Sequence, residues 1–195
     1  MNTIEVDESA LIEQAKDDRE AFGRLYELYV DRIYNYVFYR TGNSHEAEDL
    51  TARIFYRAIR HIGNYQDQGA PFGAWLYRIA RNMVANWYRD DKSDRLLPIE
   101  SALGSGNDDS PEAAIEFMED KDALLAAIRQ LPPERQELLI LKFVERMPNA
   151  EIGRIMDRSE GAIKLLYYRT LKSLREDLLG LLVEDENKLE ANGRG

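Results

Sequence analysis

The sequence predicts an all-α fold of two small helical domains joined by an acidic flexible linker. Apolar residues recur every three or four positions over most of the 195-residue chain, which is the spacing of one face of a helix. No stretch shows the strict alternation that is typical of a half-buried strand. Residues 90–111 have no sustained period and are rich in Asp, Ser and Gly, which is typical of a linker.

The N-terminal half is expected to contain one short helix and three long ones. The short helix covers roughly residues 8–18, and the first long helix covers 20–41, with an apolar stripe of Phe22, Leu25, Tyr26, Tyr29, Ile33 and Val37. After the break TGNS, Ser44 is the expected N-cap of a second helix. This helix runs to about residue 62, with inward positions at Leu50, Ile54, Ala58 and Ile62. Pro71 opens the third helix, whose expected buried face is Phe72, Trp75, Leu76, Ile79, Met83 and Trp87.

The C-terminal half resumes the helical period after the linker. Helices are expected over about 111–130, 134–146, 148–157 and 159–179, with a break at LPPE (131–134). The polar tail over 181–195 is expected to be frayed. The chain therefore divides into a first domain over 1–92, a linker over 93–111, a second domain over 112–180 and the tail.

Composition limits the class of protein. No apolar run approaches the ~20 residues of a membrane span, the acidic N-terminus lacks the form of a signal peptide, and cysteine is absent. We therefore expect a cytoplasmic protein without membrane insertion. The net charge of −10 is uneven, with +3 over residues 21–89 and −7 over residues 90–130. Because phosphate neutralisation supplies most non-specific DNA affinity, so acidic a chain would need a partner to bind DNA.

Residues 149–176 have the spacing of a helix-turn-helix, with a tight turn near Asp157 and an expected N-cap at Ser159. Its small shared core is expected to consist of Ile152, Ile155, Met156, Ile163, Tyr167 and Leu171. In this motif the early outward residues of the second helix meet base edges. Those residues are Glu160, Lys164, Leu165, Tyr168 and Arg169. The spacing alone fits a helical hairpin with a solvated face equally well.

The third long helix carries a second candidate surface for nucleic acid. Opposite its expected buried face lies a stripe of arginines and amides without any acid, made of Arg78, Arg81, Asn82, Ala85, Asn86 and Arg89. Arginine neutralises phosphate, amides read bases, and aromatic rings stack on unpaired bases. The alternative is a solvated arginine face with both tryptophans in the core, which is the better interpretation for Trp87 taken singly.

The second long helix exposes a charged face that fits either solvent or a partner protein, and it consists of Asp49, Arg53, Arg57 and Arg60. Enzyme functions are not supported. The two histidines, His45 and His61, have no metal-like partner at helical spacing. The sequence has neither a glycine loop for phosphates nor a nucleophile elbow. We expect no catalytic residue, no cofactor and no metal.

Taken in order, these segments resemble one family. The ordered set is AFGRLYELYVDRIYNYV, EAEDLTARIFYRAIRHI, FGAWLYRIARNMVANWYR, an acidic linker and LPPERQELLILKFVERMPNAEIGRIMDRSEGAIKLLYYRTLKSLRE. It is similar to the extracytoplasmic-function (ECF, group 4) class of bacterial RNA polymerase sigma factors, in the sigma-70 family. The similarity runs from about residue 8 to residue 178.

The resemblance implies a role for each domain. Residues 1–92 would be sigma region 2, which binds the polymerase core and recognises and melts the −10 promoter element. Residues 112–180 would be region 4, whose helix-turn-helix recognises the −35 element. The implied function is promoter-specific transcription initiation without enzymatic activity. The implied partners are the β and β′ subunits of the polymerase core, promoter DNA and an anti-sigma protein that holds the factor inactive.

The resemblance also implies individual site residues. The polymerase core-binding set is Asp49, Leu50, Arg53, Phe55 and Arg57. The −10 DNA-binding set is Asp67, Phe72, Trp75, Arg78, Arg81, Asn82, Asn86 and Arg89. The −35 DNA-binding set is Ser159, Glu160, Lys164, Leu165, Tyr168, Arg169 and Lys172. Asn82 and the loop over 67–72 lie where the family captures a flipped-out −10 base.

The recognition helix departs from the family pattern at two positions. Where the family commonly has a small polar residue and an arginine, this chain has Leu165 and Leu166, which removes a phosphate or base contact. One alternative is therefore a sigma-like all-helical interaction regulator that has lost part of its promoter reading. A free-standing helix-turn-helix repressor is a third hypothesis, which the net charge of −10 disfavours.

Overall fold

The structure is a computed structural model that describes residues 7–66, 71–90 and 123–192. The N-terminal half consists of α1 (Glu8–Ala15), α2 (Arg19–Thr41), α3 (Ser44–His61), the 3₁₀ turn η1 (Ile62–Asn64) and α4 (Phe72–Asp90). The C-terminal half consists of a helix over 123–130, α6 (Pro133–Leu139), the π-helical turn η3 (Ile140–Val144), α7 (Asn149–Met156) and α8 (Glu160–Asn192). No strand occurs among these residues, which agrees with the predicted all-α class.

Polar caps and a glycine set the helix ends of the N-terminal half. Asp7 and Asp18 accept hydrogen bonds at the starts of α1 and α2. Gly42 ends α2 in the left-handed region with a φ of 69°. The predicted cap of α3 was wrong by one residue. Asn43, rather than Ser44, accepts hydrogen bonds from the backbone N–H groups of the first turn, at 2.9 and 3.2 Å.

The apolar stripes of α2 and α3 face each other in the N-terminal core. The four inward positions predicted for α3 are all buried. In α2 the predicted stripe is buried except for Tyr26, which is 41% exposed and whose ring contacts Phe55 edge-on. The stripe also omitted Tyr36, which is fully buried and packs edge-to-face on Tyr77 at a ring separation of 5.3 Å.

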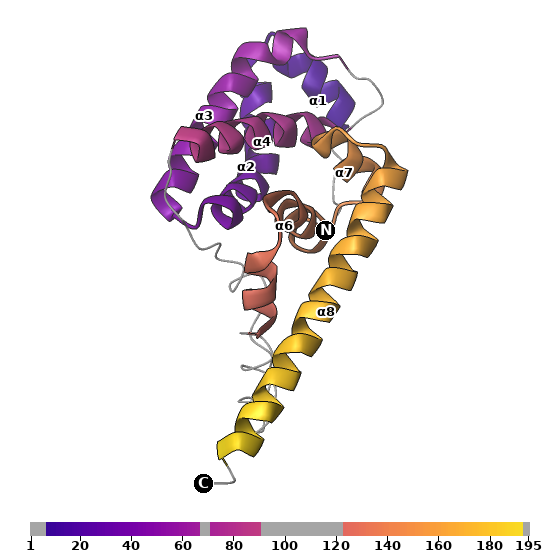
Figure 1. Cartoon of the computed structure of the whole chain (residues 1–195). Helices are drawn as coiled ribbons and strands as arrows, with labels where there is room; N and C mark the ends of the chain where they lie inside the picture. Colours follow the sequence, from indigo (N-terminus) through magenta and orange to yellow (C-terminus); the bar gives the residue numbers. More distant parts are fainter. Residues whose placement is uncertain (1–6, 67–70, 91–122, 193–195) are drawn as a thin grey trace, which may run out of the picture.

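The buried face of α4 is rotated from the predicted one. Leu76, Tyr77, Ala80 and Val84 are fully buried, whereas Trp75, Ile79, Met83 and Trp87 are only half-buried. Figure 1 shows the reason, because α4 lies between the N-terminal helices and α7. A helix with neighbours on two sides buries a wider face than a single apolar stripe predicts, so residues beside the predicted stripe are buried as well.

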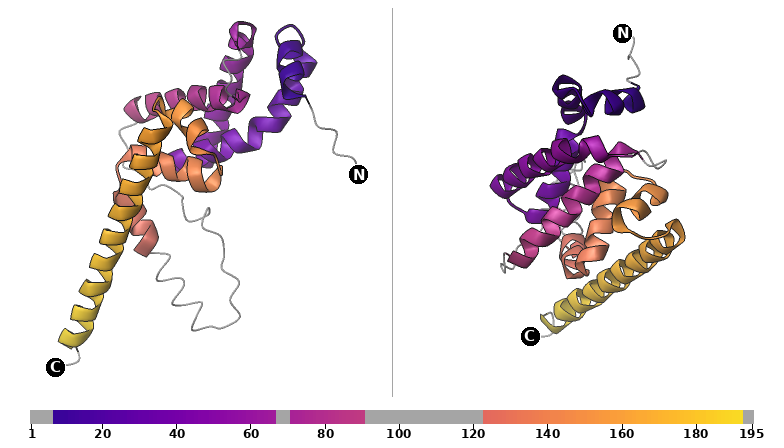
Figure 2. Two further views of the ribbon diagram at one scale, coloured as in Figure 1. Left: turned by 90° about the vertical axis from the view of Figure 1, so that its right-hand side faces the viewer. Right: turned by 90° about the horizontal axis from the view of Figure 1, so that it is seen from above.

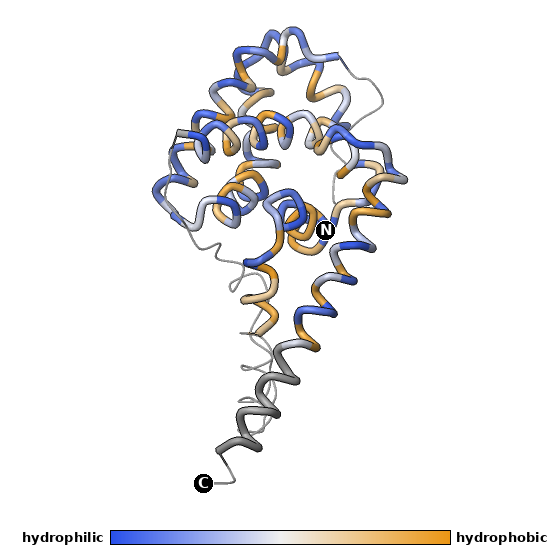
Figure 3. The backbone as a smooth tube through the Cα atoms, viewed as in Figure 1, coloured by the Kyte–Doolittle hydropathy of each residue, from blue (hydrophilic) through white to orange (hydrophobic). Residues whose placement is uncertain are grey.

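The helix over 123–130 packs against α8 in a smaller second cluster, which consists of Leu125, Ala127, Ile128, Leu131, Leu139 and Leu174. The colouring of Figure 3 shows this helix as mainly hydrophobic. Gln136 joins it to α6, because its amide donates to the carbonyls of Ile128 and Leu131 at 3.2 and 2.9 Å. Helix α8 continues into the predicted tail as far as Asn192 and extends beyond the other helices (Figure 2).

The two halves share one continuous apolar core, although the sequence left their relative placement open. Two carboxylates of the C-terminal half lie in this contact, with side chains only 5% and 4% exposed: Glu137 and Glu145. Glu137 accepts hydrogen bonds from the hydroxyl of Tyr36 at 2.8 Å and from Nε of Arg81 at 3.2 Å. We call Glu137, Glu145 and their N-terminal partners the inter-half clamp.

The second carboxylate of the inter-half clamp, Glu145, is also held by one tyrosine and one arginine. Glu145 accepts a hydrogen bond from the hydroxyl of Tyr77 and another from Nε of Arg32 at 3.4 Å. Burial raises the pKa of the Glu145 carboxyl above its ordinary value, and the contacts with Tyr77 and Arg32 only partly offset this. Burial also raises the pKa of Tyr36 and Tyr77, so both hydroxyls are proton donors at neutral pH.

None of the helices in the described ranges is both long and apolar enough to cross a membrane.

The raised pKa of Glu145 predicts a pH dependence of stability. Between the ordinary value of 4.5 and the raised value, the folded chain binds a proton that the unfolded chain has released. Stability should therefore fall as the pH rises through this window. Glu145→Gln has no titrating group here, so the wild type should lose stability relative to this variant as the pH rises from 4.5 through the raised pKa. Denaturant unfolding of both proteins across this range measures the difference, and a difference that does not change with pH would contradict the assignment.

Candidate nucleic-acid interface

Helix α4 presents the predicted arginine–amide stripe to solvent, with one exception. Arg78, Asn82, Asn86 and Arg89 are exposed. Arg81 instead turns toward the C-terminal half, where its Nε lies 3.2 and 3.3 Å from the two carboxylate oxygens of Glu137. The exposed part of the stripe is thus a surface that can neutralise phosphates and donate to base edges.

Two aromatic residues of the predicted −10 set lie at the start of α4. Phe72 is 2% exposed and packs edge-on against the rings of Tyr29 and Tyr65, which agrees with the buried face predicted for this helix. Trp75 is half-buried and lies against Tyr65, with ring centroids 5.2 Å apart. Asp67 lies outside the described residues.

Trp87 and Tyr88 at the end of α4 are tied into the N-terminal half. The indole N–H of Trp87 donates to Glu46 at 2.8 Å, and the hydroxyl of Tyr88 donates to the carbonyl of Arg40. These contacts favour a structural role for Trp87.

The helix-turn-helix has the predicted elements. Asp157 ends α7 in the left-handed region, with φ 57° and ψ 48°. The hydroxyl of Ser159 caps α8 by accepting from the N–H of Ala162 at 3.2 Å. Gly153 makes the turn possible, because a Cβ at this position would lie 2.6 Å from the carbonyl oxygen of Arg158. The angle between α7 and α8 is therefore fixed by a close backbone approach.

The expected recognition residues of α8 are all exposed, from Ser159 to Lys172. Lys164 pairs with Glu160 at 2.7 Å on this face. Leu165 and Tyr168 are 50% and 66% exposed, which is unusual for large apolar side chains.

The inward side of α8 differs in detail from the prediction. Leu171 is 40% exposed and is not part of the core. Thr170 is fully buried in its place and donates to the carbonyl of Leu166 at 2.8 Å. Leu166 is half-buried against the shared core, so only Leu165 of the adjacent leucines lies on the recognition face.

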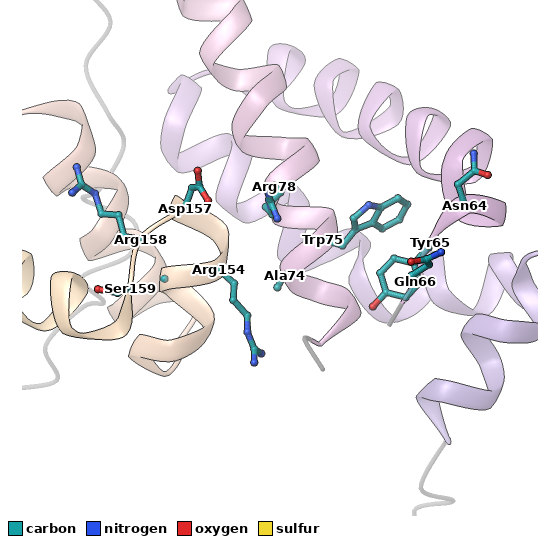
Figure 4. A pocket seen from close by; sticks show the side chains of 11 residues that line it. Asn64, Tyr65, Gln66, Ala74, Trp75, Arg78, Arg154, Asp157, Arg158 and Ser159 are labelled. Carbon is teal, nitrogen blue, oxygen red and sulfur yellow. The ribbon is translucent and has the colours of Figure 1, made fainter. Parts of the chain in front are cut away.

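An open cavity of about 710 Å³ lies between α4 and the helix-turn-helix. Figure 4 shows Trp75 and Arg78 on one side and Arg154, Arg158 and Ser159 on the other. The cavity therefore joins the start of the arginine–amide stripe to the start of the recognition helix. Arg158 pairs with Glu134 at 2.6 Å.

Of the α3 residues predicted to bind polymerase, the three charged ones are exposed and the two apolar ones are buried. Asp49, Arg53 and Arg57 are exposed, and Asp49 pairs with Arg53 at 2.8 Å. Leu50 and Phe55 are 4% and 5% exposed, so their side chains hold α3 against the core and cannot contact a partner in this structure. The assignment of these two residues to polymerase binding stays a prediction.

Sequence reasoning missed the residues of the inter-half clamp. Tyr36 and Tyr77 fall outside the apolar stripes assigned to α2 and α4, and both are fully buried. Each is directly next to a predicted inward residue, Val37 or Leu76, which could have suggested a second buried flank. Nothing in the sequence distinguishes Glu137 and Glu145 among the 36 acidic residues of the chain.

The short distance between Gly153 and the carbonyl oxygen of Arg158 allows the geometry of the α7–α8 turn to be tested. Gly153→Ala places a Cβ against a backbone oxygen that cannot move aside, so we expect a loss of about 2–4 kcal/mol in unfolding free energy. Gly161→Ala, in the first turn of α8, meets nothing within 4 Å and should be neutral or up to about 1 kcal/mol stabilising. Urea unfolding compares the two, and equal effects of both alanines would refute the turn geometry.

Comparisons with known proteins agree with this architecture. The family model of sigma-70 region 2 matches residues 25–93, and that of sigma-70 region 4 matches residues 121–174. The ECF RNA polymerase sigma factor BldN of Streptomyces coelicolor is 41% identical over 84% of this chain, which spans 63% of the length of BldN. The ECF sigma factor SigW of Bacillus subtilis is 31% identical over 85% of this chain and 93% of SigW.

A solved structure shows the same fold. The sigma factor RpoE of Bartonella quintana, in complex with the anti-sigma factor NepR, matches with a TM-score of 0.56. The match has 18% sequence identity and covers 80% of this chain and 96% of that one. The helical architecture, the two family regions and the identity to SigW lead to one conclusion: the chain belongs to the extracytoplasmic-function class of the sigma-70 family of bacterial RNA polymerase sigma factors.

Proposed function

We propose that this protein binds the RNA polymerase core in the cytoplasm and directs it to promoters. Region 2 recognises the −10 element through the exposed part of the α4 stripe, and region 4 recognises the −35 element through the outward face of α8. The observation that carries the proposal is the α4 stripe, whose Arg78, Asn82, Asn86 and Arg89 are exposed on one face of the helix. Arginine and amide side chains together provide phosphate contacts and base readout.

Polymerase must supply much of the DNA affinity. The net charge of −10 opposes the approach of free protein to DNA, because binding depends on neutralising phosphates. Bound to the core through the charged face of α3, the protein would present its two DNA surfaces as part of a larger complex. The α3 face offers Asp49, Arg53 and Arg57 for this contact. The alternative of an interaction regulator without promoter reading has weaker support, because the −10 surface is largely intact.

An anti-sigma protein is the proposed regulator. The solved structure of the related sigma factor RpoE contains the anti-sigma factor NepR. In this chain the exposed apolar side chains of region 4 offer a surface for such a protein, and they include Phe143, Leu165, Tyr168 and Leu179. Leu165 and Tyr168 lie three residues apart on α8 and are therefore neighbours on its surface, and adjoining exposed apolar side chains are typical of protein-binding sites.

The proposal predicts that the α4 stripe is needed for initiation. Arg78→Ala, Asn82→Ala and Asn86→Ala combined should lower promoter-specific run-off transcription with core polymerase by about tenfold or more, because each lost base or phosphate contact costs ~1 kcal/mol or more. Core binding should be unchanged. The matched control combines Gln14→Ala, Arg19→Ala and Arg24→Ala, which are exposed positions on α1 and α2.

Two outcomes would contradict this function. Full transcription by the α4 triple variant would remove the −10 mechanism. A wild-type protein that is folded by circular dichroism yet does not bind core polymerase would remove the function as a whole.

Substitution by arginine should have different effects at the two adjacent leucines of α8, Leu165 and Leu166. Leu165→Arg adds a positive charge to the exposed recognition face, so the polymerase complex should bind a −35 element several-fold more tightly, with a steeper salt dependence. Leu166→Arg places a charge against the core and should destabilise the chain by about 1–3 kcal/mol. Filter binding at several salt concentrations and thermal unfolding measure the two effects. Equal behaviour of the two variants would be inconsistent with the orientation of α8.

A further inference from the structure

The outward face of α8 has an apolar centre near the start of the helix. Leu165, in the second turn, is 50% exposed, and Tyr168 follows three residues later and is 66% exposed. Side chains three residues apart are neighbours on a helix surface, so these two form what we call the apolar pair. Single exposed leucines are common, but adjoining apolar side chains on a recognition face indicate a ligand that offers an apolar group.

The space in front of the apolar pair is open within the part of the chain that the structure describes. Helix α8 lies at the edge of the molecule (Figure 1). Gly161 lies one turn before Leu165 on the same face, and a Cβ added at Gly161 would meet no atom within 4 Å. The lack of a side chain at Gly161 also allows a ligand to approach the helix backbone closely. A ligand on this face can therefore reach the Leu165 side chain.

The charges around the apolar pair indicate what kind of ligand this is. Residues 158–175 carry five cationic side chains and one acidic one, although the whole chain has a net charge of −10. The cations are Arg158, Lys164, Arg169, Lys172 and Arg175, and the acid is Glu160. Arg169 and Arg175 form no ion pair with any residue that the structure describes. Cations on both sides of an apolar centre match duplex DNA, whose phosphates flank a groove that exposes base edges.

The major groove of DNA offers one apolar group, the C5-methyl group of thymine. The other features of its base edges are hydrogen-bond donors and acceptors. A leucine side chain neither donates nor accepts a hydrogen bond, so the methyl group is the feature that Leu165 can distinguish. The leucine at a position that is commonly polar in the family therefore changes which base can be recognised, and recognition at this position is not lost.

We propose that Leu165 reads the C5-methyl group of a thymine in the −35 element, with Tyr168 shielding the contact from water. This inference rests on the proposed function, because it names the base feature that region 4 recognises. Burial of one methyl group should change the affinity for the promoter about three- to fivefold. The contact thus selects an A·T pair at one position, while the surrounding cations bind phosphates of any sequence.

Replacement of thymine by deoxyuridine tests the contact, because deoxyuridine lacks only the C5-methyl group. The complex of this protein with core polymerase first selects its promoter from a duplex library that is randomised over the −35 and −10 regions. Each thymine of the selected −35 element, on either strand, is then replaced singly by deoxyuridine. At one position the replacement should weaken binding of the complex about three- to fivefold in a filter-binding assay.

Substitution of Leu165 assigns the methyl contact to its side chain. Leu165→Ala should bind the selected promoter about three- to fivefold more weakly, and it should bind the thymine and deoxyuridine forms equally, because both changes remove the same contact. Leu165→Arg should also lose the difference, since its added charge attracts the phosphates of either DNA. The matched control is Leu28→Ala on α2, whose leucine is 49% exposed, and it should keep the full difference. Circular dichroism checks that the variants fold.

The outcomes separate the methyl contact from the function. A −35 element in which no thymine methyl group affects binding would overturn the inference, even if polymerase and promoter binding were normal. A difference between thymine and deoxyuridine that persists in Leu165→Ala would overturn it as well. Unchanged promoter binding by Leu165→Ala would instead assign the apolar pair to a protein partner. A folded protein that does not bind core polymerase, or whose complex selects no sequence, would overturn the proposed function and the inference with it.

Discussion

The burial of two carboxylates determines how the halves of this protein are placed. A charge inside a protein must be paired and hydrogen-bonded, and Glu137 finds its donors on two different helices, Tyr36 on α2 and Arg81 on α4. Glu145 repeats the arrangement with Tyr77 and Arg32. The apolar core supplies most of the free energy of the contact, but apolar surfaces tolerate sliding. The directional bonds to the carboxylates select one placement of the halves.

The helices were predictable because the sequence signals that determine a helix are local. Period, caps and breaks lie within a few residues of one another, so the order of helices and most of their bounds agree with the structure. The face of α4 was not predictable, because its burial depends on α7, which lies far along the chain. The π-helical turn η3 within the predicted helix over 134–146 also has no sequence signal that we recognise.

In the candidate site, too, the features that depend on local sequence were predictable and those that depend on packing were not. The outward residues of α8 follow from the helix-turn-helix spacing, and the structure exposes them as expected. Leu50, Phe55 and Phe72 came from positions in the family pattern, and all three are buried. A position in a pattern does not reveal whether a side chain contacts a partner or supports the helix that does. Whether Leu165 or Leu166 faces a partner depends on the direction of its side chain. That direction is set by how α8 packs on the core, which the sequence does not give.

Arg81 has consequences for genetics. The same guanidinium belongs by its spacing to the proposed DNA-binding stripe and, in the structure, pairs with Glu137 of the C-terminal half. A substitution of Arg81 would therefore remove a candidate DNA contact and a contact between the halves together, whereas a substitution of Glu137 would remove only the second. Comparing the phenotypes of the two substitutions would separate an effect on DNA binding from an effect on the joining of the halves.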